Sequence, residues 1–205
     1  MQYLKFNEEA MTGDIKEASV KEIKKVCLQC KDCDLYKTRK NVVFSDGMAS
    51  APIMLIGEAP GAEEDASGIP FVGRAGRLLN ELLEESGISR KENMYICNTL
   101  KCRPPENRIP TDEEKQLCEQ YLNAQINIVR PKVVVLCGST AAKSFINDDI
   151  KISQIRGKWF NILDNIKATV IFHPSYLLRN HSLEENSPRS LTKKDLLAIK
   201  KAAIG

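Results

Sequence analysis

Seven cysteines carry the clearest chemistry in this sequence of 205 residues. Three lie in the stretch CLQCKDC, as Cys27, Cys30 and Cys33, and two more follow far downstream, as Cys102 and Cys118. A closely spaced pair and two remote cysteines can place four thiolates around a metal. Both a tetrahedral zinc ion and an iron–sulfur cluster accept four cysteines, so the spacing predicts a metal centre without choosing between them.

The other two cysteines, Cys97 and Cys137, lie within apolar runs, where we expect buried free thiols that act as small hydrophobic side chains. Cys27 is ambiguous, because it could be a spare thiol or could replace Cys30 in the ligand pair. The N-terminal stretch lacks the apolar core of a signal peptide, so we expect a cytoplasmic protein whose thiols stay reduced.

A second stretch rich in potentially functional residues is GEAPGAEEDASGIPFVGRAG, from Gly57 to Gly76. It follows an apolar run and precedes a helical pattern, and a glycine-rich turn in that position usually holds a phosphate. This turn contains four acidic residues, which would repel a phosphate, and the sequence lacks the GxxxxGK[ST] pattern of nucleotide-binding loops. The stretch therefore argues against a nucleotide-binding hydrolase or transferase.

Two further stretches combine polar side chains with residues that break regular structure. NTLKCRPPENRIP begins at Asn98, whose amide is both donor and acceptor, and its prolines indicate an exposed loop. HPSYLLR begins at His173 and ends at Arg179. A lone histidine is more often structural than catalytic, so this stretch alone assigns no function.

Patterns of secondary structure alternate with these stretches, because apolar runs predict strands and apolar residues at helical spacing predict helices. The expected strands cover residues 41–44, 52–57, 93–100, 132–138, 158–163 and 167–172. The expected helices cover residues 19–30, 74–88, 111–130, 139–146 and 192–203, with Thr111 as the N-cap of the third.

The alternation predicts a single α/β domain with a central, mainly parallel four-stranded sheet and helices on both faces, an α/β/α sandwich. We expect an N-terminal extension over residues 1–18 and the domain over residues 19–205. Ligands of such sheets bind beyond the carboxyl ends of the strands. The loops that begin at Gly57, Asn98 and His173 all follow expected strands, so we expect them to meet at one site.

Composition and charge limit the partners. No apolar run approaches the ~20 residues of a membrane span, so we expect no membrane partner. The net charge of +3 does not by itself indicate nucleic acid, but residues 151–205 hold ten Lys and Arg against four acids. This basic segment could follow a phosphate backbone, or it could be an ordinary solvated helix face.

Four stretches together resemble a known family. CKDCDLYKTRKNVVF, GEAPGAEEDASGIPFVGRAGRLL, NTLKCRPPENRIP and HPSYLLR occur in this order and are similar to motifs of the family 4 uracil-DNA glycosylases, the type with a [4Fe–4S] cluster. The resemblance covers the chain from about Cys27 to the C-terminus and implies a uracil-DNA glycosylase domain over residues 19–205. It also gives the cluster a structural role and leaves Cys27 outside the ligand pattern. The ligands it implies are Cys30, Cys33, Cys102 and Cys118.

The resemblance implies a monofunctional repair enzyme that flips uracil out of DNA and hydrolyses the N-glycosidic bond, leaving an abasic site. The flipped base is neutral, so an acidic loop can face it, and acids there favour the positive charge that develops on the sugar. The implied partner is uracil-containing DNA, single- or double-stranded. The family's default state is a monomer. A sliding clamp is a further partner that we expect.

Three residues are expected to act at the reacting bond. Glu58 would position water or stabilise the sugar cation, Glu64 matches a family position important for activity, and His173 would donate a hydrogen bond to uracil O2 as the base leaves. The best-known uracil-DNA glycosylases have an aspartate where this loop has Ala59, so charge stabilisation is expected in place of that general base. The alternatives are a helix-capping role for Glu58, a surface position for Glu64 and a structural histidine.

The uracil pocket is expected to combine stacking with hydrogen bonds. Phe71 would stack on the base, and the Asn98 amide would bind O4 and N3–H of uracil, a pattern that cytosine does not present. Without the resemblance, Phe71 would be assigned to core packing. The alternative for Asn98 is a turn-forming residue. The expected substrate-binding residues are Ala59, Gly61, Phe71, Asn98 and Asn107.

DNA would be held by phosphate contacts and by an apolar side chain inserted into the base stack. We expect Leu177 or Leu178 to fill the space left by the base, unless both simply begin a core helix. Two other functions stay open, a non-catalytic iron–sulfur DNA-binding module and a relative that traps uracil-DNA covalently. The expected DNA-binding residues are Lys101, Arg103, Arg108, Ser175, Leu177, Leu178 and Arg179.

Overall fold

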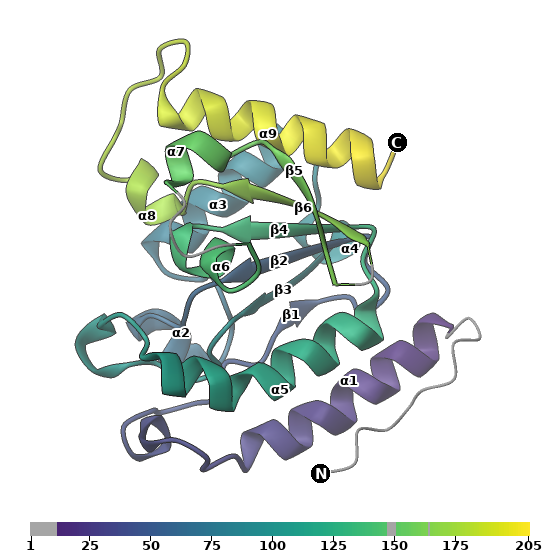
Figure 1. Cartoon of the computed structure of the whole chain (residues 1–205), viewed down its shortest axis with the longest axis vertical. Coiled ribbons are helices and arrows are strands. Elements are labelled where there is room, and N and C mark those ends of the chain that lie inside the picture. Colours follow the sequence, from purple (N-terminus) through teal and green to yellow (C-terminus); the bar gives the residue numbers. More distant parts are fainter. Residues whose placement is uncertain (1–11, 147–150, 164) are drawn as a thin grey trace.

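The structure, a computed structural model, describes residues 12–146, 151–163 and 165–205. Within these residues one mixed sheet has six strands in the order β1-β3-β2-β4-β6-β5 (Figure 1). The edge strands β1 (Asp46–Gly47) and β5 (Trp159–Ile162) pair antiparallel with their neighbours. The four inner strands are parallel: β3 (Met94–Asn98), β2 (Ile53–Gly57), β4 (Val133–Cys137) and β6 (Ile166–Ile171).

The predicted α/β sandwich is confirmed, but the sheet has six strands where four were predicted. The stretch at residues 158–163 joins the sheet as the edge strand β5, and β1 is only two residues long, too short to show any periodicity. The predicted strand at residues 41–44 is wrong. Val43 is fully buried, yet its N–H donates to the carbonyl of Lys101 (2.8 Å) in a loop and not to a strand.

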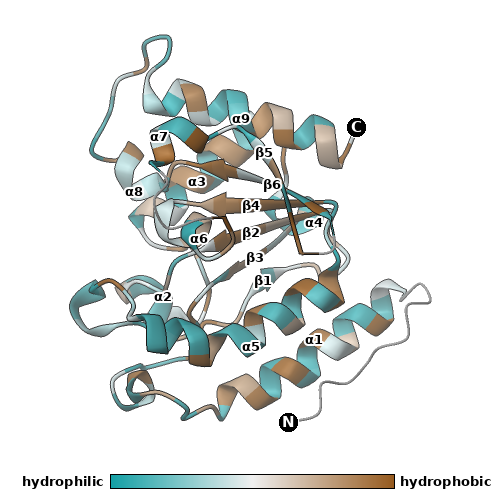
Figure 2. Ribbon diagram, in the orientation of Figure 1, coloured by the Kyte–Doolittle hydropathy of each residue, from teal (hydrophilic) through white to brown (hydrophobic). Residues whose placement is uncertain are grey.

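Helices cover both faces of the sheet (Figure 1). Side chains alternate between the two faces, so Met54 and Ile56 of β2 pack in one core, and Ile53 and Leu55 in the other. Figure 2 shows the result, with hydrophobic inner strands and helices that are hydrophilic on much of their surface. The first core is covered by α1 (Gly13–Leu28), α5 (Asp112–Val129) and α6 (Ser139–Lys143), and the second by α3 (Arg74–Glu85) and α9 (Pro188–Ala203).

α1 begins earlier than the predicted start at residue 19. Its first turns are tied to the domain, since Lys16 Nζ donates to the carbonyl of Val129 (2.7 Å) and the Glu17 carboxylate accepts from the N–H of Ala49 (2.6 Å). α1 therefore crosses the predicted boundary between residues 18 and 19 as one helix. The division into extension and domain stays a prediction, and most of the extension, residues 1–11, lies outside the described residues.

The other long helices agree with the predictions apart from their ends. Thr111 caps α5 as predicted, because its hydroxyl accepts from the N–H of Glu114 (3.1 Å). α9 begins at Pro188 behind Ser187, about a turn before the predicted start. No helix in the described ranges is long and apolar enough to cross a bilayer. The short helical segments are η1 (Asp34–Lys37), α2 (Ala62–Ser67), α4 (Arg90–Asn93), η2 (Pro105–Asn107), α7 (Ile152–Ile155) and α8 (Pro174–Leu177).

The inner strands all end at one edge of the sheet. Gly57 at the end of β2 lies in register with Asn98 at the end of β3, and β6 ends just before His173. The pairing continues beyond the strands, because the Leu100 N–H donates to the carbonyl of Glu58 (3.0 Å). The loops after β2 and β3 therefore begin side by side, and the loop after β6 begins at the same edge, one strand further away across β4.

Candidate active site and thiol cavity

The loop after β2 holds Phe71 in a backbone conformation that residues other than glycine rarely adopt, with φ of +54°. The Arg90 guanidinium fixes it by donating to the carbonyls of Phe71 (Nη1, 2.9 Å) and Pro70. Gly76 leaves room for the Phe71 carbonyl, since any side-chain carbon there would overlap it. Such strain persists only where several contacts enforce it, and it is frequent at binding sites.

Glu64 binds the backbone of the same loop. Its carboxylate accepts from the N–H groups of Gly61 (3.1 Å), Val72 (3.0 Å) and Gly73 (2.8 Å). Gly73 is the N-cap of α3, so the carboxylate satisfies donors at the start of that helix. These three backbone donors of the glycine-rich loop are therefore satisfied by the protein's own Glu64 carboxylate.

Replacing Glu64 with alanine should lower the free energy of unfolding by ~1–3 kcal/mol, because backbone donors lose their acceptor. Urea unfolding measures the change. The matched control is Glu63→Ala, which removes the adjacent, exposed acid that pairs with Arg77 and should leave the unfolding midpoint unchanged. Equal midpoints for the two variants would contradict the anchoring role of Glu64.

Asn98 lies against this loop with 2% of its surface exposed. At Gly57, the space that a side-chain carbon would take is filled by Asn98 Oδ1 and the Phe71 ring, so only glycine lets the amide and the ring meet there. The Phe71 ring also lies beside His173, with 6.0 Å between ring centroids. The structure thus brings Phe71, Asn98 and His173 together from three separate loops, as predicted.

His173 follows β6 and caps α8. Its Nδ1 accepts from the N–H of Ser175 (3.2 Å) and lies 2.8 Å from the Ser175 hydroxyl. Because Nδ1 is an acceptor, the proton of the neutral ring is on Nε2, which is therefore a hydrogen-bond donor. Burial lowers the pKa of His173 below its usual value, while nearby Glu58 opposes the shift, so the ring is neutral at neutral pH.

The lowered pKa of His173 predicts how stability depends on pH. Below about pH 6.5 the unfolded chain protonates this histidine before the folded chain does, so stability falls as the pH drops through this range and is fully present above it. Urea unfolding at pH 7.5 and pH 5.5 should show a smaller loss for His173→Gln than for the wild type. His181→Gln, at an exposed position, should behave as the wild type. An unchanged loss in His173→Gln would contradict this linkage.

The side chains on and next to α8 differ in their exposure from what a DNA-contacting segment requires. Leu177 is 2% exposed and packs in the core beneath α3, so its predicted insertion into DNA is wrong and the alternative of a core leucine holds. Leu178 is half-buried, and Arg179 is exposed. Tyr176 is 39% exposed, with its ring 5.1 Å from that of Phe172.

Lys101 does not face solvent. It is 1% exposed, and its Nζ donates to the carbonyl of Asn98 (2.6 Å) and to Gln125 Oε1 (2.6 Å). The prediction that Lys101 contacts a DNA phosphate is therefore wrong, because the ammonium is enclosed. The side chain reaches inward from the loop after β3.

The remaining cations of that loop are engaged with neighbours. Arg108 donates through both Nη atoms to Glu114 (2.8 and 2.6 Å), and Arg103 Nε donates to Asn107 Oδ1 (2.8 Å). The Arg108 guanidinium holds the pKa of Glu114 below its usual value. The basic segment at residues 151–205 is also partly neutralised by ion pairs. Its paired cations are Arg156, Arg189, Lys193 and Lys194.

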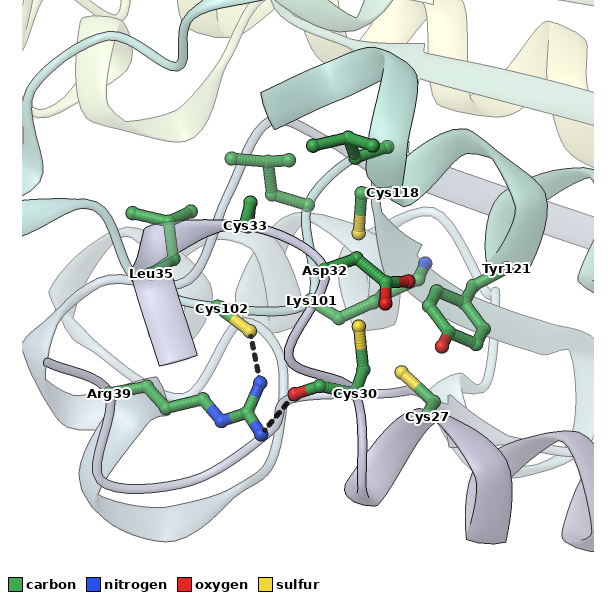
Figure 3. Close-up of a pocket in the computed structure, with 12 residues that line it drawn as sticks. Cys27, Cys30, Asp32, Cys33, Leu35, Arg39, Lys101, Cys102, Cys118 and Tyr121 are labelled. Atoms are coloured by element: carbon green, nitrogen blue, oxygen red, sulfur yellow. Dashed lines mark hydrogen bonds between the residues drawn. The ribbon is translucent and has the colours of Figure 1, made fainter. Parts of the chain in front are cut away.

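A cavity between α1, η1, the loop after β3 and α5 gathers the cysteines that were predicted to bind metal (Figure 3). The Arg39 guanidinium lies at its side and donates to Cys102 Sγ (3.0 Å) and to the carbonyl of Cys30 (2.8 Å). Burial raises the pKa of the Cys118 thiol to about 12, although nearby Lys101 opposes the shift. The thiols that line the cavity are Cys27, Cys30, Cys33, Cys102 and Cys118.

The five thiols line one cavity together with an aspartate, an arginine and a lysine, Asp32, Arg39 and Lys101. Across residues 12–146, 151–163 and 165–205, no three His, Cys, Asp or Glu side chains are arranged to hold one metal ion. Apolar side chains, among them Leu35 and Leu100, close the cavity around the thiols. Cys97 and Cys137 lie elsewhere, fully buried in strands, as predicted.

Two residues of the site were missed by reasoning from the sequence. Arg39 lies within the stretch CKDCDLYKTRK, so its motif was recognised but its bond to a thiol was not. Arg90 carries no local signal. It reaches the Phe71 loop only because α4 returns beside β1, where Arg90 Nε donates to Asp46 (2.8 Å).

Comparison with known proteins agrees with this arrangement. The family model described as "Uracil DNA glycosylase superfamily" matches residues 44–197. The chain is 50% identical over 157 residues to a type-4 uracil-DNA glycosylase of Thermotoga maritima, covering 76% of this chain and 81% of that protein. It is 40% identical over 190 residues to one of Archaeoglobus fulgidus (89% and 95%) and 36% identical over 193 residues to one of Sulfurisphaera tokodaii (91% and 86%).

These matches extend over most of each relative, and the family model covers all three loops that meet at the strand ends. Fold, site and sequence similarity therefore lead to the same assignment. The chain belongs to the uracil-DNA glycosylase superfamily, among the type-4 uracil-DNA glycosylases.

Proposed function

We propose that this protein is a monofunctional uracil-DNA glycosylase, which hydrolyses the bond between uracil and deoxyribose in DNA and leaves an abasic site. The observation that carries the proposal is the meeting of Phe71, Asn98 and His173 at the strand ends, with a histidine whose Nε2 is a donor. The three side chains supply a stacking face, an amide and a donor to a leaving oxygen. That set suits a planar neutral base better than a phosphate.

Each side chain has a distinct task in the pocket. The Phe71 ring stacks on the flipped base, and the Asn98 amide pairs with O4 and N3–H, which cytosine cannot satisfy. His173 Nε2 donates to O2 as negative charge develops on the departing uracil. A neutral histidine suits this task, because Ser175 holds the ring in the required tautomer.

Glu58 is the acid best placed to act on the sugar. It follows Gly57 directly, and its charge is near enough to oppose the lowering of the pKa of His173. A carboxylate there stabilises the positive sugar as the bond breaks and positions the attacking water. Ala59 and Gly61 let the backbone come close to the substrate.

Glu64 contributes by shaping the loop. Its carboxylate already accepts from three backbone N–H groups, so we assign it to holding Phe71 and the start of α3 in place. A direct part in the reaction would require it to leave those donors. Glu64 matches a family position that is important for activity. Holding the loop in shape explains that importance without requiring Glu64 to contact the reacting bond.

The thiol cavity is proposed to hold a [4Fe–4S] cluster bound by Cys30, Cys33, Cys102 and Cys118. Four thiols from three separate segments around one cavity suit a cluster, which spreads its ligands wider than a single ion does. When bound, the cluster would cross-link the segment between α1 and η1, the loop after β3 and α5. Cys27 also faces the cavity and remains a fifth thiol without an assigned ligand role.

Contact with DNA is proposed for the side chains that the structure leaves near the surface of the site. Arg103, Arg108 and Asn107 lie on the loop after β3, and Ser175, Leu178 and Arg179 on or next to α8. Leu178 is the remaining candidate to fill the space of the flipped base. A monomeric state, a sliding-clamp partner and a cytoplasmic location stay predictions.

A cleavage assay tests the proposal directly. An end-labelled oligonucleotide with one uracil, single-stranded or opposite G or A, is incubated with the protein and then treated with alkali. A break only at uracil and only after alkali supports a monofunctional glycosylase. Binding on native gels without any break would overturn it in favour of a DNA-binding module, and an SDS-resistant adduct would indicate a relative that traps its substrate.

A further inference from the structure

Lys101 is among the largest fully buried side chains, and it is a cation. Its Nζ donates to the carbonyl of Asn98 and to Gln125 Oε1, and it lies 5.9 Å from the centre of the Phe44 ring. Gln125 is itself fixed, since its Nε2 donates to the carbonyl of Phe44 (3.1 Å) and to the hydroxyl of Tyr95 (3.0 Å). The ammonium is therefore held at one place by neutral acceptors.

A buried cation is costly unless a negative charge balances it. No carboxylate pairs with Lys101 in the described part of the chain. Lys101 lines the thiol cavity together with its five cysteines (Figure 3). The balancing charge thus has one evident source, thiolates that bind a metal cluster.

Lys101 also contacts the proposed uracil pocket, through Asn98. Lys101 Nζ bonds the carbonyl of Asn98, and Cys102 directly follows Lys101 in the chain. The backbone from Asn98 onward is also tied to the first loop, since the Thr99 N–H donates to the carbonyl of Gly57 (2.9 Å). One short segment therefore has a proposed cluster ligand at one end and the base-reading amide at the other.

We propose that Lys101 is a positioning residue that couples the thiol cavity to the uracil pocket, by balancing the thiolate charge and by fixing the Asn98 backbone from which the amide projects. The inference rests on the proposed function, since it needs both the cluster and the role of Asn98. It gives the cluster a structural effect on substrate recognition through one side chain. Lys101 itself does not touch the substrate.

The test uses the cluster-loaded protein with Lys101→Met, which keeps the length of the side chain and removes the charge and the donors. We expect iron and sulfide content close to wild type and a cluster reduction potential that is more negative, because a nearby positive charge is lost. Single-turnover uracil excision should fall at least tenfold. The matched control is Lys31→Met, an exposed lysine beside the ligand Cys30, which should change neither the potential nor the rate.

A double-mutant cycle with Asn98→Ala separates positioning from general damage. If Lys101 acts through Asn98, Lys101→Met should slow the Asn98→Ala enzyme far less than it slows the wild type. Equal slowing in both backgrounds, or an unshifted potential, would overturn the inference. Should Lys101→Met not fold, Lys101→Gln, which keeps one donor, is measured in the same way, and failure of both to fold would also overturn it in favour of a purely structural lysine.

The outcomes also separate this inference from the proposed function. A wild-type protein that releases no uracil would sink the function itself. A fully active Asn98→Ala would remove Asn98 from the pocket. An active wild type, a slowed but measurable Asn98→Ala and an unaffected Lys101→Met would leave the function standing and reject only the coupling.

Discussion

Replacing His173 with alanine is expected to slow uracil excision by ~10²–10³-fold under single-turnover conditions, the effect of removing one preorganised donor to a developing oxyanion. The reason is specific to this site. The Ser175 N–H occupies Nδ1, so the neutral ring has its donor on Nε2 without a change of protonation. The half-buried ring lies beside that of Phe71, the side chain proposed to stack on the base.

The measurement is release of uracil from labelled DNA with enzyme in excess, together with DNA affinity on an uncleavable analogue. Affinity should change little, because the donor acts mainly as the bond breaks. His181→Ala is the matched control, since His181 is the only other histidine and is exposed. A His173→Ala enzyme within threefold of wild type would exclude His173 as the donor to O2.

Replacing Cys102 with alanine is expected to abolish cluster binding and, with it, most of the activity. A bound group stabilises the folded state by ~4 kcal/mol when present at a thousand times its dissociation constant, so its loss should lower the unfolding midpoint by roughly 10 °C for a chain of this size. Cys102 lies on the segment that begins at Asn98. Loss of the cluster should therefore also leave the Asn98 end of this segment less firmly held. The uracil excision rate should fall by at least about tenfold.

Iron analysis, thermal unfolding and the excision assay are read on the same preparations. Cys137→Ala is the control, because it removes a buried thiol in β4 that lies outside the cavity. It should keep its iron and its activity while losing some stability to the small cavity it creates. Full iron content in Cys102→Ala would show that Cys102 is not a ligand and would return Cys27 to consideration as the fourth thiol.

For the four acids of the first loop, residue type predicted their shared effect, but only the structure shows what each one contacts. Their charge argued against a phosphate cradle, and in the structure the Glu64 carboxylate accepts from the N–H groups of Val72 and Gly73 at the start of α3. Their individual tasks were not visible. Asp65 accepts from the backbone N–H groups of Lys40 and Asn41, and Glu63 pairs with Arg77 at the surface. Of the four, Glu58 remains the one that we propose to act at the reacting bond.

The sequence by itself determined the α/β class, the inner parallel strands and the three loops that meet. These follow from short-range patterns: apolar runs give buried strands, and parallel strands must end at one edge. The capping of α5 by Thr111 is equally local. The four cysteines grouped from the sequence, Cys30, Cys33, Cys102 and Cys118, do share the cavity, while their binding of a metal stays a prediction.

Only the tertiary structure decided which way each side chain points. Lys101 and Leu177 have residue types that suit DNA contact, yet both are buried, because the surrounding loops and helices enclose them. Arg90 holds Phe71 from a helix distant in sequence, and Arg39 reaches a thiol across a fold in the chain. Burial and long-range contact are properties of packing, and no local pattern of residues encodes them.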